Sequence, residues 1–213
     1  MSDIWATISA ERSALAGELA DLTPTQWDTP SLCPGWTVRD IVAHLSATAS
    51  LTPATFFLGM AKAKFNFDKF ANEQIAKHRG ADPFATLAEF QGLQNSTSAP
   101  PGPKTSWLGE VVVHGADVRR PLGIPHTYAP DAVRQAIDFY KGSNMLLGSK
   151  NRVAGLALSA TDHDWQHGEG PNAQAVEGPL LSLLLAMTGR AAACDDLLGP
   201  GVPMLRSRCA PAR

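Results

Sequence analysis

Hydrophobic side chains recur at steps of three and four residues through the first segment of the chain. This recurrence predicts an amphipathic helix over residues 4–22, for which Ser2 is placed as the cap. A second helix is predicted to open at Thr37, with Asp40 at the spacing of a capping box. Its apolar face comprises Val38, Ile41, Val42, Leu45 and Ala49.

Three further helices are expected before residue 125. One covers residues 66–79, another starts at Asp82-Pro83 and runs through Phe90, and the third covers about 105–119 and stops at Arg120-Pro121. Pro53 either kinks the second helix or begins a new one. Four or five amphipathic helices with short connections are typical of a helical bundle.

The pattern changes after Pro125. A helix over 131–147 is followed by alternating segments at 153–160 and 164–170, a short strand at 174–177 and an apolar helix at 180–187. We therefore predict an α+β chain with two domains. Residues 1–125 would form the helical bundle, and residues 126–213 a small α+β domain packed on it.

Composition narrows the class of protein. The 213 residues are 44% hydrophobic and 18% charged, with a net charge of −2, a balance that does not favour nucleic acid or anionic membranes as partners. No apolar run approaches the ~20 residues of a membrane-spanning helix. The start of the chain lacks the order of a signal peptide, so a cytoplasmic location is expected. The three scattered cysteines predict no disulfide framework. Cys33 is a candidate nucleophile, although a buried or loop cysteine is the commoner role.

The candidate chemistry starts with Glu110 and His114. In a strand, residues four apart lie ~13 Å from each other, whereas in a helix both side chains can reach one metal ion. Trp107, Val111 and Val118 form an apolar stripe in the helical alternative, which we favour. The same spacing also suits an ordinary Glu–His pair on a helix flank. His44, at the border of the second helix's buried face, is a possible third ligand, or a hydrogen-bonded histidine at a helix–helix contact.

Two segments carry a family resemblance. CPGWTVRDIVAHL (residues 33–45) and EVVVHGADVRRPLG (residues 110–123) resemble the motifs of the mycothiol-dependent maleylpyruvate isomerase family. ATDHDW (160–165), GEGP (168–171) and Gly189-Arg190 are similar to its C-terminal domain. The resemblance implies a DinB-like antiparallel four-helix bundle, with a divalent metal, expected to be zinc, held by His44, Glu110 and His114.

The resemblance also implies mycothiol as thiol cofactor or co-substrate. A metal-bound thiolate would attack a small electrophile, giving thiol transfer or cis–trans isomerisation. Asp117 is expected to orient a ligand or bind substrate. Arg190 is the candidate catalytic arginine, with Arg206 as the other possible match.

Other interpretations remain open. A metal-dependent hydrolase would use water in place of the thiol, and a non-catalytic regulatory module would bind the metal or thiol alone. Asp162, His163, Asp164 and His167 have the residue types of a second metal site, but their position between predicted strands favours turn roles.

Overall fold

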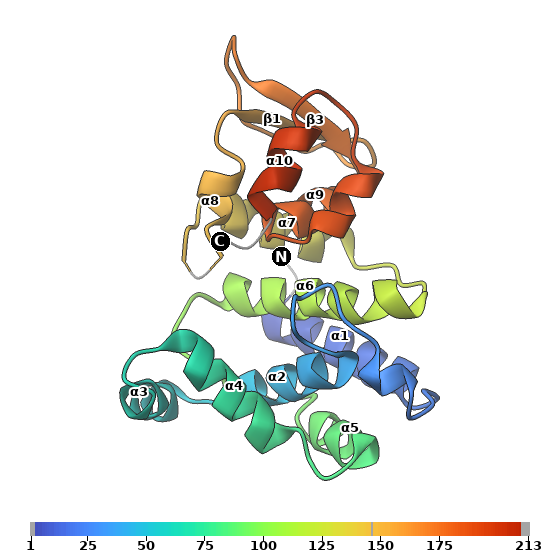
Figure 1. Ribbon diagram of the computed structural model, residues 1–213, viewed down its shortest axis with the longest axis vertical. Coiled ribbons are helices and arrows are strands. Elements are labelled where there is room, and N and C mark those ends of the chain that lie inside the picture. Colours follow the sequence, from blue (N-terminus) through green and yellow to red (C-terminus); the bar gives the residue numbers. More distant parts are fainter. Residues whose placement is uncertain (1–2, 146, 210–213) are drawn as a thin grey trace. The chain divides into compact units, whose positions relative to one another are not determined.

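Helices form most of the fold, and one small sheet completes it (Figure 1). The computed structural model describes residues 3–145 and 147–209. The chain divides into two units, one reaching Thr127 and the other beginning at Tyr128. The predicted α+β class is confirmed.

The N-terminal unit contains six α-helices and a short 3-10 helix among its described residues. They are α1 (Ile4–Leu19), η1 (Gln26–Asp28), α2 (Val38–Ser50), α3 (Pro53–Lys62), α4 (Phe67–His78), α5 (Pro83–Gly92) and α6 (Lys104–Leu122). The sequence predicted four or five helices and left open whether Pro53 begins another. That further helix is α3, whose residues are all at least partly exposed.

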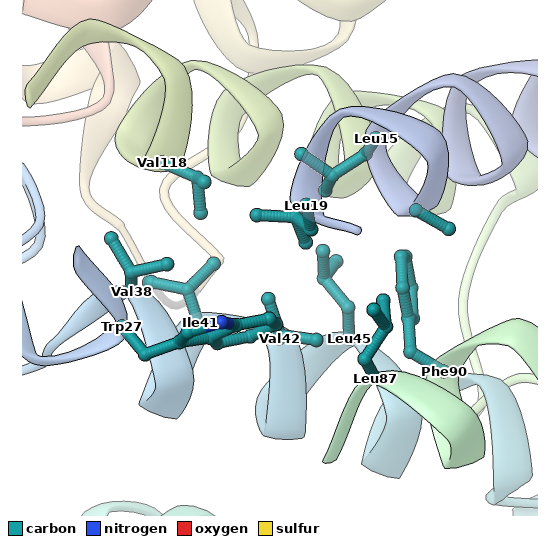
Figure 2. Close-up of a cluster of buried hydrophobic side chains, with 11 residues drawn as sticks. Leu15, Leu19, Trp27, Val38, Ile41, Val42, Leu45, Leu87, Phe90 and Val118 are labelled. Carbon is teal, nitrogen blue, oxygen red and sulfur yellow. The ribbon is translucent and has the colours of Figure 1, made fainter. Parts of the chain in front are cut away.

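Four of these helices surround one hydrophobic cluster. Figure 2 shows α1 contributing Leu15 and Leu19, and α2 contributing Ile41, Val42 and Leu45. The same cluster also contains Phe90 from α5, Val118 from α6 and Trp27 from η1. Burial of this apolar surface is the main force that holds the helices together. The cluster also fixes α2 and α6, which carry the candidate ligands.

Helix starts follow the predicted caps in most cases. Thr37 and Asp40 form the expected capping box, and Asp82 caps α5. Thr52 caps α3 with Pro53 at its first position, so Pro53 begins a new helix and does not kink α2. Ser2 lies outside the described residues, and Asp3 is the cap of α1.

The predicted end of α6 at Arg120-Pro121 is wrong. The helix continues through Pro121 to Leu122 and ends at Gly123, which has φ of 66°. A proline leaves the carbonyl four residues earlier without its helical donor. Here that carbonyl belongs to Asp117, and the backbone N–H of Leu32 donates to it at 3.2 Å. The loop before α2 therefore compensates for the proline.

The C-terminal unit has three strands in the order β2-β1-β3. β1 (Leu156–Ala160) pairs antiparallel with β2 (Gln166–His167) and parallel with β3 (Gln174–Gly178). Its helices are α7 (Pro130–Lys141), α8 (Ser149–Arg152), α9 (Leu180–Met187), η2 (Ala191–Asp196) and α10 (Val202–Cys209).

Three boundaries in this unit correct the sequence prediction. The helix predicted over 131–147 ends at Lys141, capped by Gly142. The strand predicted over 153–160 begins at Leu156, because Gly155 has φ of 74° and the preceding residues close α8. The strand predicted over 164–170 is reduced to Gln166–His167. The short helices α8, η2 and α10 were not predicted. None of the described helices is long and apolar enough to cross a bilayer.

Candidate metal centre

Two helices carry the three candidate ligands. His44 lies on α2, and Glu110 and His114 lie one turn apart on α6. The three valines between Glu110 and His114 are buried, and the segment is helical as predicted. The i,i+4 spacing places both polar side chains on the same flank of α6.

The structure brings the three side chains together. Nε2 of His44 lies 3.3 Å from Oε1 of Glu110, and the His44 and His114 ring centroids are 4.9 Å apart in an edge-to-face arrangement. The side chains are 19%, 12% and 13% exposed for His44, Glu110 and His114, respectively. The cluster is therefore largely shielded but not sealed from solvent.

The Glu110 carboxylate is the unusual member of the cluster. Among the described residues no group donates a hydrogen bond to its buried Oε1, since the 3.3 Å contact with His44 does not have hydrogen-bond geometry. Burial alone would raise the pKa of Glu110, but the neighbouring His44, His114 and Thr48 outweigh burial and lower the pKa below its ordinary value. A buried anionic oxygen that lacks a donor is suited to a cation.

Asp117 orients His114. Its side chain is fully buried, and Oδ2 lies 2.8 Å from Nδ1 of His114. An Nδ1–H that donates to this carboxylate puts the lone pair of the ring on Nε2. Metal-binding histidines in proteins usually have such a second partner. Full burial favours this orienting role of Asp117 over contact with a substrate.

Trp36 is a neighbour of the site to which sequence analysis gave no role. Its ring centroid lies 5.0 Å from that of His44 and 6.2 Å from that of His114. The bond from Leu32 to Asp117 ties its loop to α6. Trp36 was part of the quoted motif, but only the folded loop shows that it faces both imidazoles.

Arg12 on α1 was also missed. It is 4% exposed, and its Nη1 donates to the Ser96 carbonyl at 2.8 Å. Burial lowers the pKa of Arg12, while the charge of Glu110 opposes that shift. The signal was present in the sequence, because Arg12 follows Ile8 by four residues and precedes Leu15 by three, on the apolar face of the helix.

The side chains of His44, Glu110 and His114 do not surround a common point in this structure. Within residues 3–145 and 147–209, no group of three or more His, Cys, Asp or Glu side chains has metal-binding geometry. His44 lies against Glu110, so a shared ion would require a side-chain adjustment. The donor set still fits zinc, because two imidazoles and one carboxylate are common zinc ligands. The unpartnered Glu110 oxygen supports the same fit.

The other candidate residues have structural contacts. Arg190 and Arg206 belong to the C-terminal unit. Arg190 is buried and donates to the Thr188 carbonyl, whereas Arg206 is exposed and pairs with Asp195. Cys33 packs, partly buried, against the hydrophobic cluster. Asp162 Oδ1 accepts the backbone N–H of Leu180 at the start of α9, in agreement with the turn interpretation.

Comparison with known proteins identifies the N-terminal part of the chain. Residues 8–101 match the family model described as the mycothiol maleylpyruvate isomerase N-terminal domain. These residues are therefore similar to that domain. The resemblance found in the sequence motifs is thereby confirmed. The matched range of the maleylpyruvate isomerase domain includes His44 and ends before Glu110 and His114.

Solved structures extend the likeness in fold. A crystal structure of the mycothiol-dependent maleylpyruvate isomerase aligns with a TM-score of 0.62 at 17% identity, covering 92% of this chain and 91% of that chain. A histidine-to-alanine mutant of the mycothiol-dependent maleylpyruvate isomerase aligns with a TM-score of 0.64 at 15% identity and the same coverage. At these identities the likeness concerns the fold alone. No curated protein matches the sequence closely enough to count as a relative.

Proposed function

We propose that this chain is a mycothiol-using enzyme that holds a divalent metal, most favourably zinc, on His44, Glu110 and His114. The observation that carries the proposal is the proximity of these three side chains, one of which has a buried carboxylate oxygen with no hydrogen-bond partner among the described residues. The family of the N-terminal domain supports mycothiol as the thiol.

A divalent metal at this site would supply one kind of chemistry, the deprotonation of a thiol at neutral pH. Residues of this chain would bind and orient such a metal. Glu110 provides a negative charge, and the two imidazoles provide neutral nitrogen donors. Asp117 holds the His114 ring in one orientation, and the Trp36 ring lies beside both imidazoles.

A small electrophile would complete the reaction. If the thiol adds to an activated double bond and leaves again, the result is cis–trans isomerisation; if it stays attached, the result is thiol transfer. Arg190 stays the candidate catalytic arginine on the basis of the family resemblance alone. Hydrolysis, or regulatory binding without catalysis, are the rival functions.

The first experiment measures zinc binding to the full, metal-free chain by titration calorimetry. We expect one zinc per chain, with the affinity reduced at least about 100-fold in His44→Ala and His114→Ala. His163→Ala is the matched control, because His163 lies in a turn of the C-terminal unit beside Asp162. Stoichiometric zinc binding that survives both site substitutions would disprove the metal centre.

The second experiment separates the rival functions. Zinc-loaded protein is incubated with mycothiol and maleylpyruvate, and the product is followed by absorbance and mass spectrometry. Isomerisation or a thiol adduct that requires both zinc and mycothiol supports the proposal. Turnover of an ester or amide without any thiol would favour the hydrolase instead.

A further inference from the structure

A second group of reactive side chains lies elsewhere in the N-terminal unit. Ser50 is the last residue of α2, His78 is the last residue of α4, and Glu89 lies on α5. Three helices thus place a hydroxyl, an imidazole and a carboxylate in one row. None of these residues takes part in the candidate metal centre.

The distances in this row follow the order nucleophile, base, acid. Oγ of Ser50 lies 3.3 Å from Nε2 of His78, and Nδ1 of His78 lies 2.6 Å from Oε1 of Glu89. An Nδ1–H that donates to the Glu89 carboxylate leaves Nε2 as an acceptor facing the hydroxyl. A nucleophile in reach of a base that a third group orients is the arrangement of serine hydrolases.

The histidine and the serine of this row differ in their exposure to solvent. His78 is only 5% exposed, whereas Ser50 is exposed, so the base is shielded and the hydroxyl is accessible. The Ser50 hydroxyl currently donates to the Ala47 carbonyl at 2.8 Å. Rotation about a single side-chain bond would redirect that proton to Nε2.

A cavity adjoins the row. It has a volume of about 410 Å³, and both Ser50 and His78 line it. Leu51 and Leu58 supply apolar walls, while Lys62, Gln74 and Lys77 supply hydrogen-bond donors. Glu73 also lines it and pairs with Lys69 at 3.8 Å. This volume suits a small molecule, and cationic donors beside a nucleophile can stabilise an oxyanion.

We propose that Ser50, His78 and Glu89 form a second active site that hydrolyses esters of short-chain carboxylic acids. His78 takes the Ser50 proton as Oγ bonds to the ester carbonyl carbon. The carbon–oxygen bond to the alcohol then breaks, and His78 returns the proton to the leaving alcohol. Water repeats the exchange on the acyl-serine and releases the acid, so the balance requires only ester and water.

The test measures hydrolysis of p-nitrophenyl acetate by the full chain in EDTA, which removes any contribution from a bound divalent metal. We expect Ser50→Ala to lower the rate above background at least about 100-fold, and Glu89→Gln at least about 10-fold. The matched control is Ser207→Ala. The Ser207 hydroxyl also donates to the carbonyl three residues earlier, at 2.8 Å, and no histidine partner is found for it among the described residues.

A covalent probe tests the reactivity of Ser50 even if the ester is a poor substrate. A fluorophosphonate should label Ser50, located by peptide mass spectrometry, and the label should disappear in His78→Gln when circular dichroism shows that variant to be folded. If Ser50→Ala hydrolyses the ester at the wild-type rate, or if only other residues are labelled, the second active site is disproved. Ser50, His78 and Glu89 would then only connect three helices.

Discussion

At the scale of single residues, Asp117 makes two different contacts at the candidate metal centre. Its carboxylate is fully buried 2.8 Å from Nδ1 of His114, and its backbone carbonyl accepts the Leu32 N–H. One residue therefore orients a proposed ligand with its side chain and anchors the Trp36 loop with its main chain. A mutation can separate these two contacts, because the contact with His114 needs the carboxylate and the bond from Leu32 does not.

Replacing Asp117 with Asn should weaken zinc binding by about 10–100-fold, because the amide no longer fixes the His114 tautomer with a negative charge. The Leu32 bond to the main chain should persist. Competition against a chromogenic chelator gives the affinity, and the Leu32 amide exchange rate reports the loop. Asp131→Asn, on the exposed first turn of α7, is the control. Unchanged zinc affinity in Asp117→Asn would remove the orienting role.

At the scale of helices, caps determine where the site-bearing segments begin. Thr37 accepts the Asp40 N–H, and Asp40 accepts the Thr37 N–H. Asp40 is also paired with Arg79 at 2.9 Å, which ties the start of α2 to the end of α4. This cap sets the start of the helix that carries both His44 and Ser50.

Thr37→Ala should lower the free energy of unfolding by roughly 0.5–2 kcal/mol, because the N–H of Asp40 loses its acceptor. Urea denaturation followed by circular dichroism measures the difference. Thr25→Ala is a suitable comparison, since Thr25 precedes η1 without a side-chain cap bond. Equal effects of the two substitutions would mean that the capping box contributes nothing specific.

Buried charges join α1 to α6. Nε of Arg119 lies 2.6 Å from Oε2 of Glu18, and His126 contacts both Glu11 and Glu18 at 3.0 and 3.1 Å. The Arg119 side chain is only 3% exposed. Loss of one member would leave another charge buried and poorly compensated.

Arg119→Met should therefore destabilise the chain by about 3–5 kcal/mol, the cost of breaking a buried ion pair by removing one partner. Arg206→Met removes an arginine from the exposed pair with Asp195 and should have a much smaller effect, because solvent screens exposed ion pairs. Thermal unfolding of both variants tests the contrast. A smaller effect at Arg119 than at Arg206 would contradict it.

Asp162 links the turn after β1 to the start of α9. Burial raises its pKa, but the neighbouring His163 imidazole, 3.0 Å away, and the hydrogen bond from the Leu180 N–H outweigh burial, so the pKa is lowered. A depressed pKa in the folded state means that the contribution to stability is present above the unfolded pKa, near 4. It is lost as the pH falls through the folded value.

Asp162→Asn should thus destabilise the chain at pH 7, and the difference from wild type should shrink as the pH falls below about 4. Denaturant unfolding at pH 7 and pH 3 gives the two differences. Asp164→Asn serves as the control, because no hydrogen bond or ion pair of Asp164 is found among the described residues and no pH-dependent difference is expected. A destabilisation by Asp162→Asn that stays constant with pH would show that ionisation of Asp162 is not involved.

At the scale of the whole molecule, global unfolding should report the coupling of metal and thiol. Two imidazoles and one carboxylate would leave a zinc ion short of ligands, and a thiol would supply the missing donor. Linkage requires each partner to strengthen the binding of the other by the same factor. Ligands that bind only the folded state raise the thermal midpoint.

Zinc and mycothiol together should therefore raise the midpoint by more than the sum of their separate shifts. His114→Ala should lose that excess and remain folded, since its side chain lies at the edge of the core. Differential scanning fluorimetry with each partner alone and with both measures the four midpoints. Strictly additive shifts, or mycothiol binding that ignores zinc, would instead identify a thiol-binding module.

Local patterns in the sequence determined much of this protein. The helical spacing of Glu110 and His114, the capping box at Thr37 and the start of α5 at Asp82 depend on residues within one turn of each other. Such interactions can be predicted because helix geometry converts sequence spacing directly into distance. The bounds of the short strand β2 and the existence of α8, η2 and α10 escaped prediction, since a few residues carry too little periodicity.

Only the tertiary structure decided which distant residues meet. It placed His44 against Glu110, gave Trp36 two imidazole neighbours, and aligned Ser50, His78 and Glu89 from three helices. It also allowed α6 to continue beyond Pro121, because the Leu32 N–H donates to the Asp117 carbonyl in place of the missing helical donor. Contacts of this kind depend on how the apolar faces of several helices pack around a common core, and no spacing along one segment encodes that packing.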